Sequence, residues 1–209
     1  SCVAKLSGNT TRSLADTSFF AIAAPSMEGK TQSAFVFKIL KALYFSFGGN
    51  EQLIYKNFAS LSDSLEAFAR SDVRDMLNIQ SRLNGLISAS DIESCFQNVK
   101  LRTLGFLVAL VKESCDNFEQ SNLPWMKYHA QRPDFEFMPL SYSEFLTMSK
   151  NKNLFTGFCL FLDEFMDHDW SVFIRNLARK IGLTCVVANT NSRIGNLVGS
   201  RRSSGSSNA

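Results

Sequence analysis

Residues 18–31 read SFFAIAAPSMEGKT, and this stretch decides the fold that we expect. The continuous apolar run 18–24 is typical of a buried strand. Residues 25–29 interrupt the run, and a segment able to form a helix follows from 30 to about 40. The order of strand, turn and helix predicts an α/β fold in which strands pair in parallel through crossover helices.

The turn fits the phosphate-binding pattern A-x-x-x-x-G-K-T. In this pattern backbone N–H groups meet the phosphates, the lysine reaches the β- and γ-phosphates, and the last hydroxyl ligates Mg²⁺. We therefore expect ATP and Mg²⁺ as ligands, with Thr31 on the metal. The residues predicted to bind the nucleotide are Ala24, Pro25, Ser26, Met27, Glu28, Gly29, Lys30 and Thr31.

A second apolar run, 158–162, ends in two carboxylates, Asp163 and Glu164. A strand delivers its last residues to the carboxyl edge of a parallel sheet, where ligands bind in open α/β folds. Asp163 is predicted to hold Mg²⁺ through water, and Glu164 to act as general base towards an attacking water. The alternative is a strand that enters an acidic loop, because Asp167 and Asp169 follow.

A third apolar run, 183–188, ends in polar residues. Asn189 is the first choice and Thr190 the second for a side chain that holds the water or the γ-phosphate. Arg193 is a candidate for stabilising transition-state charge, as are Arg175 and Arg179. A polar turn and solvated arginines explain the same residues without a catalytic role.

The remaining sequence sets the expected domain organisation. Residues 1–17 are expected to be a loose lead-in and 199–209, rich in Ser and Gly, a disordered tail. The domain between them, 18–198, is predicted to have a large, mainly helical middle segment, 52–149. The fold expected is an α/β three-layer sandwich with a mostly parallel sheet.

Further elements are predicted within this domain. Strands are expected at 42–47, 157–162 and 183–188, and helices at 100–118 and 170–181. Capping boxes, in which two side chains satisfy the first amides of a helix, are expected at Asp63 with Glu66, Ser90 with Glu93 and Ser141 with Glu144.

Composition narrows the class of protein. The chain has 209 residues, 45% of them hydrophobic and 20% charged, which is typical of a globular domain. A net charge of +3 is too small to indicate strong nucleic-acid binding. Five scattered cysteines without a CxxC pair argue against zinc, and Cys159 and Cys185 fall in apolar runs as reduced core thiols. Such thiols favour an intracellular type of chain.

No apolar run is long enough to span a membrane, and no signal peptide is visible at the N-terminus. The chain starts at Ser1 and not at Met, which is compatible with a piece of a longer protein.

The motifs at 24–31 and 158–164 together resemble P-loop NTPases that carry a catalytic Glu after the magnesium Asp, a class that includes AAA+ and STAND ATPases. Three segments, LFLDEF at 160–165, FIRNLARKIGL at 173–183 and VVANTNSRIGNL at 186–197, are similar to the NTPase region of the Crinkler effectors of oomycetes. That resemblance implies an ATPase-like module of a protein delivered into host cells, often to the nucleus.

Three functions remain open at this point. The first is an ATPase that uses the γ-phosphate to switch conformation or assembly. The second is a nucleotide-binding interaction module with little or no turnover, which self-association or a protein partner would suit. The third is a segment of a nucleic-acid-handling effector.

Overall fold

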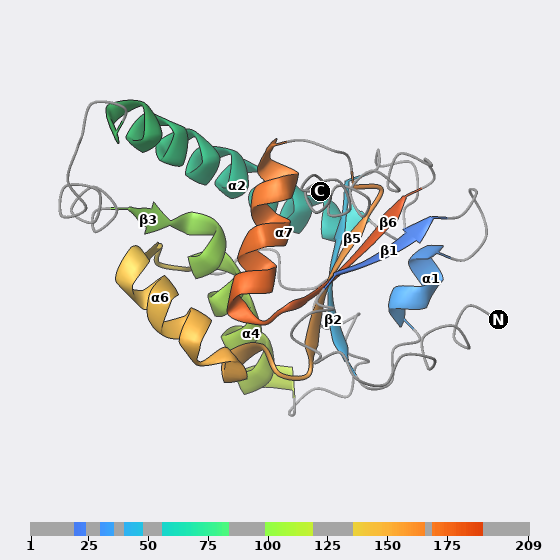
Figure 1. Cartoon of the computed structure of the whole chain (residues 1–209). Helices are drawn as coiled ribbons and strands as arrows, with labels where there is room; N and C mark the ends of the chain where they lie inside the picture. Colours follow the sequence, from blue (N-terminus) through green and yellow to red (C-terminus); the bar gives the residue numbers. More distant parts are fainter. Residues whose placement is uncertain are drawn as a thin grey trace, which may run out of the picture.

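The structure centres on a four-stranded parallel sheet with the strand order β1-β6-β5-β2 (Figure 1). The strands are β1 (Phe19–Ala23), β2 (Lys41–Ser46), β5 (Phe158–Asp163) and β6 (Thr184–Asn189). This computed structural model describes residues 19–23, 30–35, 40–47, 56–83, 99–118, 136–165 and 169–189.

Helices cover both faces of the sheet. Helix α1 (Lys30–Phe35) lies on one face, where Ala34 packs with Tyr44 and Phe161. Helices α2 (Lys56–Leu83), α4 (Arg102–Phe118) and α7 (Asp169–Ile181) pack against the other face, on a larger apolar core (Figure 1). The described elements therefore form three layers: α1, the sheet, and the larger group of helices.

Two of the three crossover connections between the described strands explain this division. The connection β1–α1–β2 runs across the sheet in one direction, and β5–α7–β6 runs back in the other. Parallel crossovers share one hand, so connections that run in opposite directions must place their helices on opposite faces. The expected α/β fold with a mostly parallel sheet is confirmed.

Side chains along each strand alternate between the two faces of the sheet, and this alternation explains why there is a core on each face. Tyr44 and Phe161 face α1, whereas Phe45 and Leu162, one residue on, face the larger helical group. Successive side chains of a strand point to opposite faces, so a strand buried on both faces is apolar throughout. Strands β2, β5 and β6 follow this rule, with buried residues at every central position.

The strand β1 differs from its prediction. It was expected to be buried, but it lies at the edge of the described sheet, and Ala21 is exposed. An apolar run alone does not distinguish a central strand from an edge strand. The predicted strands in the runs ending at 47, 162 and 188 are confirmed, each with bounds shifted by a residue at most.

Beyond the sheet, the helical group carries smaller elements. A short antiparallel ladder joins β3 (Lys100–Leu101) to β4 (Leu140–Ser141). Helix α6 (Tyr142–Lys150) and the 3₁₀ helix η4 (Lys152–Phe155) follow β4.

The capping box at the start of α6 is confirmed. Ser141 Oγ accepts from the N–H of Glu144, and Glu144 Oε2 accepts from the N–H of Ser141 at 2.7 Å. Hydrogen bonds from the Ser141 hydroxyl and backbone lower the pKa of the Glu144 carboxyl.

A second predicted capping box, Asp63 with Glu66, is wrong. Helix α2 already begins at Lys56, and an apolar stripe through Leu61 and Leu65 carries it past Asp63 without a break. Glu66 instead pairs with Arg70, one turn on, at 2.6 Å. The third predicted box, Ser90 with Glu93, lies outside the described residues, as do the lead-in 1–17 and the tail 199–209.

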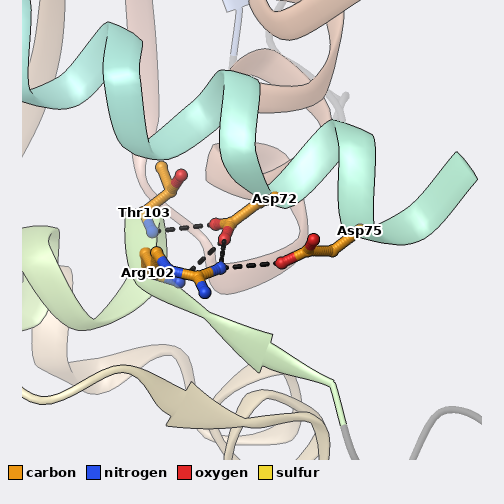
Figure 2. Close-up of polar contacts among 4 residues, drawn as sticks. All are labelled: Asp72, Asp75, Arg102 and Thr103. Atoms are coloured by element: carbon orange, nitrogen blue, oxygen red, sulfur yellow. Dashed lines mark hydrogen bonds and ion pairs between the residues drawn. The ribbon is translucent and has the colours of Figure 1, made fainter. Parts of the chain in front are cut away.

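A buried carboxylate ties α2 to α4 (Figure 2). Asp72, 1% exposed, accepts hydrogen bonds from the backbone N–H groups of Arg102 at 3.0 Å and Thr103 at 2.8 Å. The Arg102 guanidinium reaches Asp75 at 2.8 Å. Asp72 therefore satisfies two of the amides that α4 leaves unpaired at its start, a task that usually falls to a residue next to the helix.

Burial raises the pKa of Asp72, and the hydrogen bonds from Thr103 and Arg102 offset only part of that rise. None of the described helices is long and apolar enough to cross a membrane.

Candidate functional site

The candidate site lies at the carboxyl edge of the sheet. All four strands run parallel, so their last residues meet at one edge, with Ala23 opposite Asn189, and Asp163 opposite both Ala188 and Ser46. The connections that leave β1 and β5 at this edge lead to opposite faces. In open α/β sheets, ligands bind outside the carboxyl ends of the strands, near the point where connections diverge to opposite faces.

The predicted phosphate loop leaves this edge from β1. Its first six residues, 24–29, lie outside the described residues, but both flanks are described. Strand β1 ends at Ala23, and α1 begins at Lys30 and Thr31. The predicted context of a strand before the loop and a helix after it is therefore confirmed.

Asp163 ends β5, and its carboxylate lies on the α1 side of the sheet. It is 3% exposed, and Tyr44 Oη donates a hydrogen bond to its Oδ2 at 2.7 Å. Its Oδ1 accepts from the N–H of Glu164 at 3.1 Å. Tyr44 and Asp163 share the face on which α1 packs, so the carboxylate and the helix that starts at Lys30 lie on the same side.

Glu164 follows in a strained conformation. Its φ is 53°, and it is the one non-glycine residue with positive φ in the described part of the chain. This left-handed region is costly for a residue with a Cβ, and such strain gathers at functional sites. The side chain of Glu164 is exposed, unlike those of its neighbours Asp163 and Phe165. The turn therefore presents one carboxylate to solvent at the sheet edge.

Asn189, at the end of β6, hydrogen-bonds the residue that follows Glu164 in this turn. Its Nδ2 donates to the carbonyl oxygen of Phe165 at 2.7 Å. The Phe165 ring is buried and packs against Phe47 and Trp170, both with centroids 5.3 Å away. Asn189 was predicted to hold the water or the γ-phosphate. The structure gives its amide a contact that positions the turn carrying Glu164.

The predicted arginines lie elsewhere. The Arg175 guanidinium lies over the ring of Phe19 at 5.6 Å, at the first residue of β1 and so towards the amino edge of the sheet. Arg179 is further along α7, whose last turn leads to the start of β6. Neither Arg175 nor Arg179 therefore lies among the residues that end the strands at the carboxyl edge, and a role in stabilising charge stays a prediction. Thr190 and Arg193 lie outside the described residues.

Tyr44 is the site residue that the sequence prediction missed. A signal was available, because a buried tyrosine hydroxyl requires a hydrogen-bond partner. Strand alternation also places Tyr44 on one face with Ala42 and Ser46. What the sequence did not reveal was that β2 lies beside β5, with Ser46 level with Asp163.

The described residues contain no group of three or more His, Cys, Asp and Glu side chains suited to a metal ion. Magnesium commonly needs fewer protein ligands, because one or two carboxylates hold it together with substrate phosphates and water. Asp163 with the Thr31 hydroxyl would be a set of this kind.

The two thiols predicted in the core are confirmed there. Cys159 on β5 and Cys185 on β6 are buried, and burial raises the pKa of each to about 12. A thiol with so high a pKa stays protonated at neutral pH and is a poor nucleophile. Neither thiol is therefore suited to act as a nucleophile.

Comparisons with protein-family models, with curated proteins and with solved structures found no match to this chain.

Proposed function

We propose that this chain is an ATP-binding P-loop NTPase domain that hydrolyses ATP with Mg²⁺. The observation that carries the proposal is that the strands leading into the two motifs end at one sheet edge. Strand β1 leads into the phosphate-loop pattern, and β5 ends in Asp163 and Glu164 two strands away. The strand between them, β6, ends in Asn189, which braces the Glu164 turn.

The chemistry follows from the groups at that edge. In this proposal Lys30 holds the phosphates, Thr31 would ligate the magnesium, and Glu164 accepts a proton from the attacking water. The water oxygen bonds to the γ-phosphorus while the bond from that phosphorus to the bridging oxygen breaks, and ADP leaves with that oxygen. Magnesium, when bound, neutralises charge on the phosphate oxygens.

Asp163 fits the part of the metal ligand. Its carboxylate lies on the α1 side of the sheet, the side on which Thr31 opens α1. Hydrogen bonds to both of its oxygens hold it still, yet a carboxylate oxygen accepts more than one bond. In this proposal a bridging water would take a further such bond.

The second candidate is a nucleotide-binding module with little or no turnover. The small exposure of Asp163, 3%, favours it, because metal access there is narrow. Met27 and Glu28 also replace the small residues usual in the loop, and Glu28 adds a carboxylate near the phosphates.

We also propose that the module is of the Crinkler type. The described parts of the three segments that carry the resemblance fall on the consecutive elements β5, α7 and β6. Under this proposal the module would serve an effector delivered to a host cell or its nucleus. A protein partner or a second copy would then read the nucleotide state. Handling of nucleic acid is the weaker reading, given a net charge of +3.

Phosphate release from ATP, measured with and without Mg²⁺, separates the candidates. The ATPase requires Mg²⁺-dependent release of phosphate above the background of an Asp163→Asn variant. Tight ATP binding without release supports the module without turnover. Absence of both contradicts the nucleotide site altogether.

A further inference from the structure

Tyr44 is a buried tyrosine whose hydroxyl reaches the carboxylate at the end of the neighbouring strand. It lies within β2, is 0% exposed, and donates to Asp163 Oδ2 at 2.7 Å across 119 residues of sequence. Its ring stacks on Phe161, with centroids 5.8 Å apart. Because the sheet and this stacking fix the ring, the position of the hydroxyl is fixed as well.

The Tyr44 hydroxyl and a backbone amide together hydrogen-bond both oxygens of the Asp163 carboxylate. Oδ2 accepts from Tyr44, and Oδ1 accepts from the backbone N–H of Glu164. A carboxylate free to rotate could leave the Glu164 amide and weaken the strained turn, in which φ is 53°. The distance of 2.7 Å is typical of a well-formed O–H···O hydrogen bond.

We infer that Tyr44 is a positioning residue of the nucleotide site, which acts by orienting the Asp163 carboxylate towards the metal. This inference rests on the proposed function. Groups that hydrogen-bond to a metal-binding carboxylate set its orientation, and their loss commonly weakens metal affinity or activity by about 10- to 100-fold. Tyr44 acts through Asp163 and touches neither the nucleotide nor the reacting water in this account.

The test is Tyr44→Phe, which keeps the ring and removes the hydroxyl. ATP affinity is measured by calorimetry in EDTA and again across a Mg²⁺ titration. We expect affinity in EDTA to match wild type within about twofold, and the Mg²⁺ concentration for half-maximal tightening to rise about tenfold. These readouts do not depend on turnover.

A matched control removes another hydrogen bond at the end of the same strand. The Ser46 N–H donates to Ser62 Oγ at 2.8 Å, so Ser62→Ala disturbs the carboxyl end of β2 without touching Asp163. It should leave the Mg²⁺ titration unchanged. An equal shift in Ser62→Ala would reduce Tyr44 to a merely structural residue and overturn the inference.

A second readout uses protein free of metal and nucleotide. Urea unfolding of wild type, Tyr44→Phe, Asp163→Ala and the double variant forms a cycle that isolates the coupling of the two side chains. We expect Tyr44→Phe to destabilise the wild type but to have little effect in the Asp163→Ala background. Equal effects in both backgrounds would show that Tyr44 does not act through Asp163.

The outcomes separate this inference from the function beneath it. A wild type that binds ATP with Mg²⁺, and a Tyr44→Phe variant that responds to Mg²⁺ identically, overturn the role of Tyr44 alone. A wild type that binds no ATP in either condition overturns the nucleotide site and the role of Tyr44 with it.

Discussion

At the scale of single residues, Glu164 combines strain with exposure. Its φ of 53° has a cost that a glycine would not bear, and nothing about its burial explains why a glutamate is kept there. A proton-accepting role would explain it, because the turn directs the carboxylate out of the sheet edge directly after Asp163. Two predictions follow from this position, one for stability and one for chemistry.

Replacing Glu164 with glycine should stabilise the fold while it removes the base. The relief of left-handed strain is worth about 1–2 kcal/mol, and the flexibility of glycine in the unfolded chain takes back about 0.5–1 kcal/mol. We expect the free energy of unfolding in urea to stay level or rise. Asp169→Gly is the control, because Asp169 begins α7 and its loss should destabilise that helix. A clear fall in the free energy of unfolding of Glu164→Gly would contradict the claim that Glu164 is strained.

Substitutions of the two carboxylates should have different effects on ATP binding and hydrolysis. Glu164→Gln keeps the shape of the side chain and should spare ATP binding while slowing hydrolysis about 10²- to 10⁴-fold. Asp163→Asn should weaken both Mg²⁺-dependent binding and turnover, because it alters the residue assigned to the metal. Single-turnover hydrolysis and equilibrium binding, measured on both variants, check this. If Glu164→Gln hydrolysed ATP at the wild-type rate, a group other than Glu164 would have to be the general base.

At the scale of elements, the sequence predicted individual strands and helices better than their assembly. Alternation and apolar runs located β2, β5 and β6 because burial on both faces leaves a continuous apolar signal. The pairing of β2 with β5 depends on contacts between segments far apart in the sequence, Lys41–Ser46 and Phe158–Asp163, which no local pattern encodes. For the same reason Tyr44 was missed, although Asp163 was predicted to face the ligand.

The long helix α2 shows a second limit. A capping box was predicted at Asp63 because its spacing fits, but the stripe through Leu61, Leu65 and Ala69 outweighs that local signal. Tertiary packing of an apolar face contributes more to a helix than a possible cap within it. The link from Asp72 to the start of α4 was equally invisible, since that cap comes from another helix.

A substitution at Gly105 tests how closely α4 approaches the backbone at Met138 and Pro139. A Cβ on Gly105 would clash with the backbone oxygen of Met138, so the chain there would have to move. Gly→Ala inside a helix normally stabilises by about 1 kcal/mol. We expect Gly105→Ala instead to destabilise by about 1–3 kcal/mol, the usual cost of overpacking. Thermal unfolding decides it, and a higher melting temperature would contradict the close approach.

The Asp72 link should make stability depend on pH in a defined direction. Burial raises its pKa in the fold above the ordinary 3.8, so the folded state binds the proton more tightly than the unfolded state. Stability from this group is therefore fully present below the unfolded pKa and is lost as pH rises through the folded pKa.

Asp72→Asn isolates this effect, because asparagine keeps an acceptor oxygen but does not titrate. We expect the wild type to gain stability relative to Asp72→Asn as pH falls from 7 towards 4, measured by urea unfolding at each pH. A relative loss on acidification would mean that the hydrogen bonds from Arg102 and Thr103 dominate over burial.

At the scale of the whole molecule, the strands that lead into the two motifs end at one edge because the sheet is parallel. Residues 24–31 and 158–164 lie far apart in sequence, and the order β1-β6-β5-β2 brings the strands that carry them to one edge. The sequence predicted that both would end at a carboxyl edge. It did not predict that one strand would separate them, or that the residue ending that strand would hold the turn between Asp163 and α7.

The central claim is that this edge binds a nucleotide through Lys30, and calorimetry of ATP with Mg²⁺ tests it most directly. Lys41→Ala is the matched control, since Lys41 opens β2 at the amino edge and lies over the Phe158 ring at 5.7 Å. We predict that Lys30→Ala weakens ATP binding at least tenfold, about 1.4 kcal/mol, while Lys41→Ala binds as wild type does. Equal affinity in Lys30→Ala and wild type would contradict the phosphate loop and the function built on it.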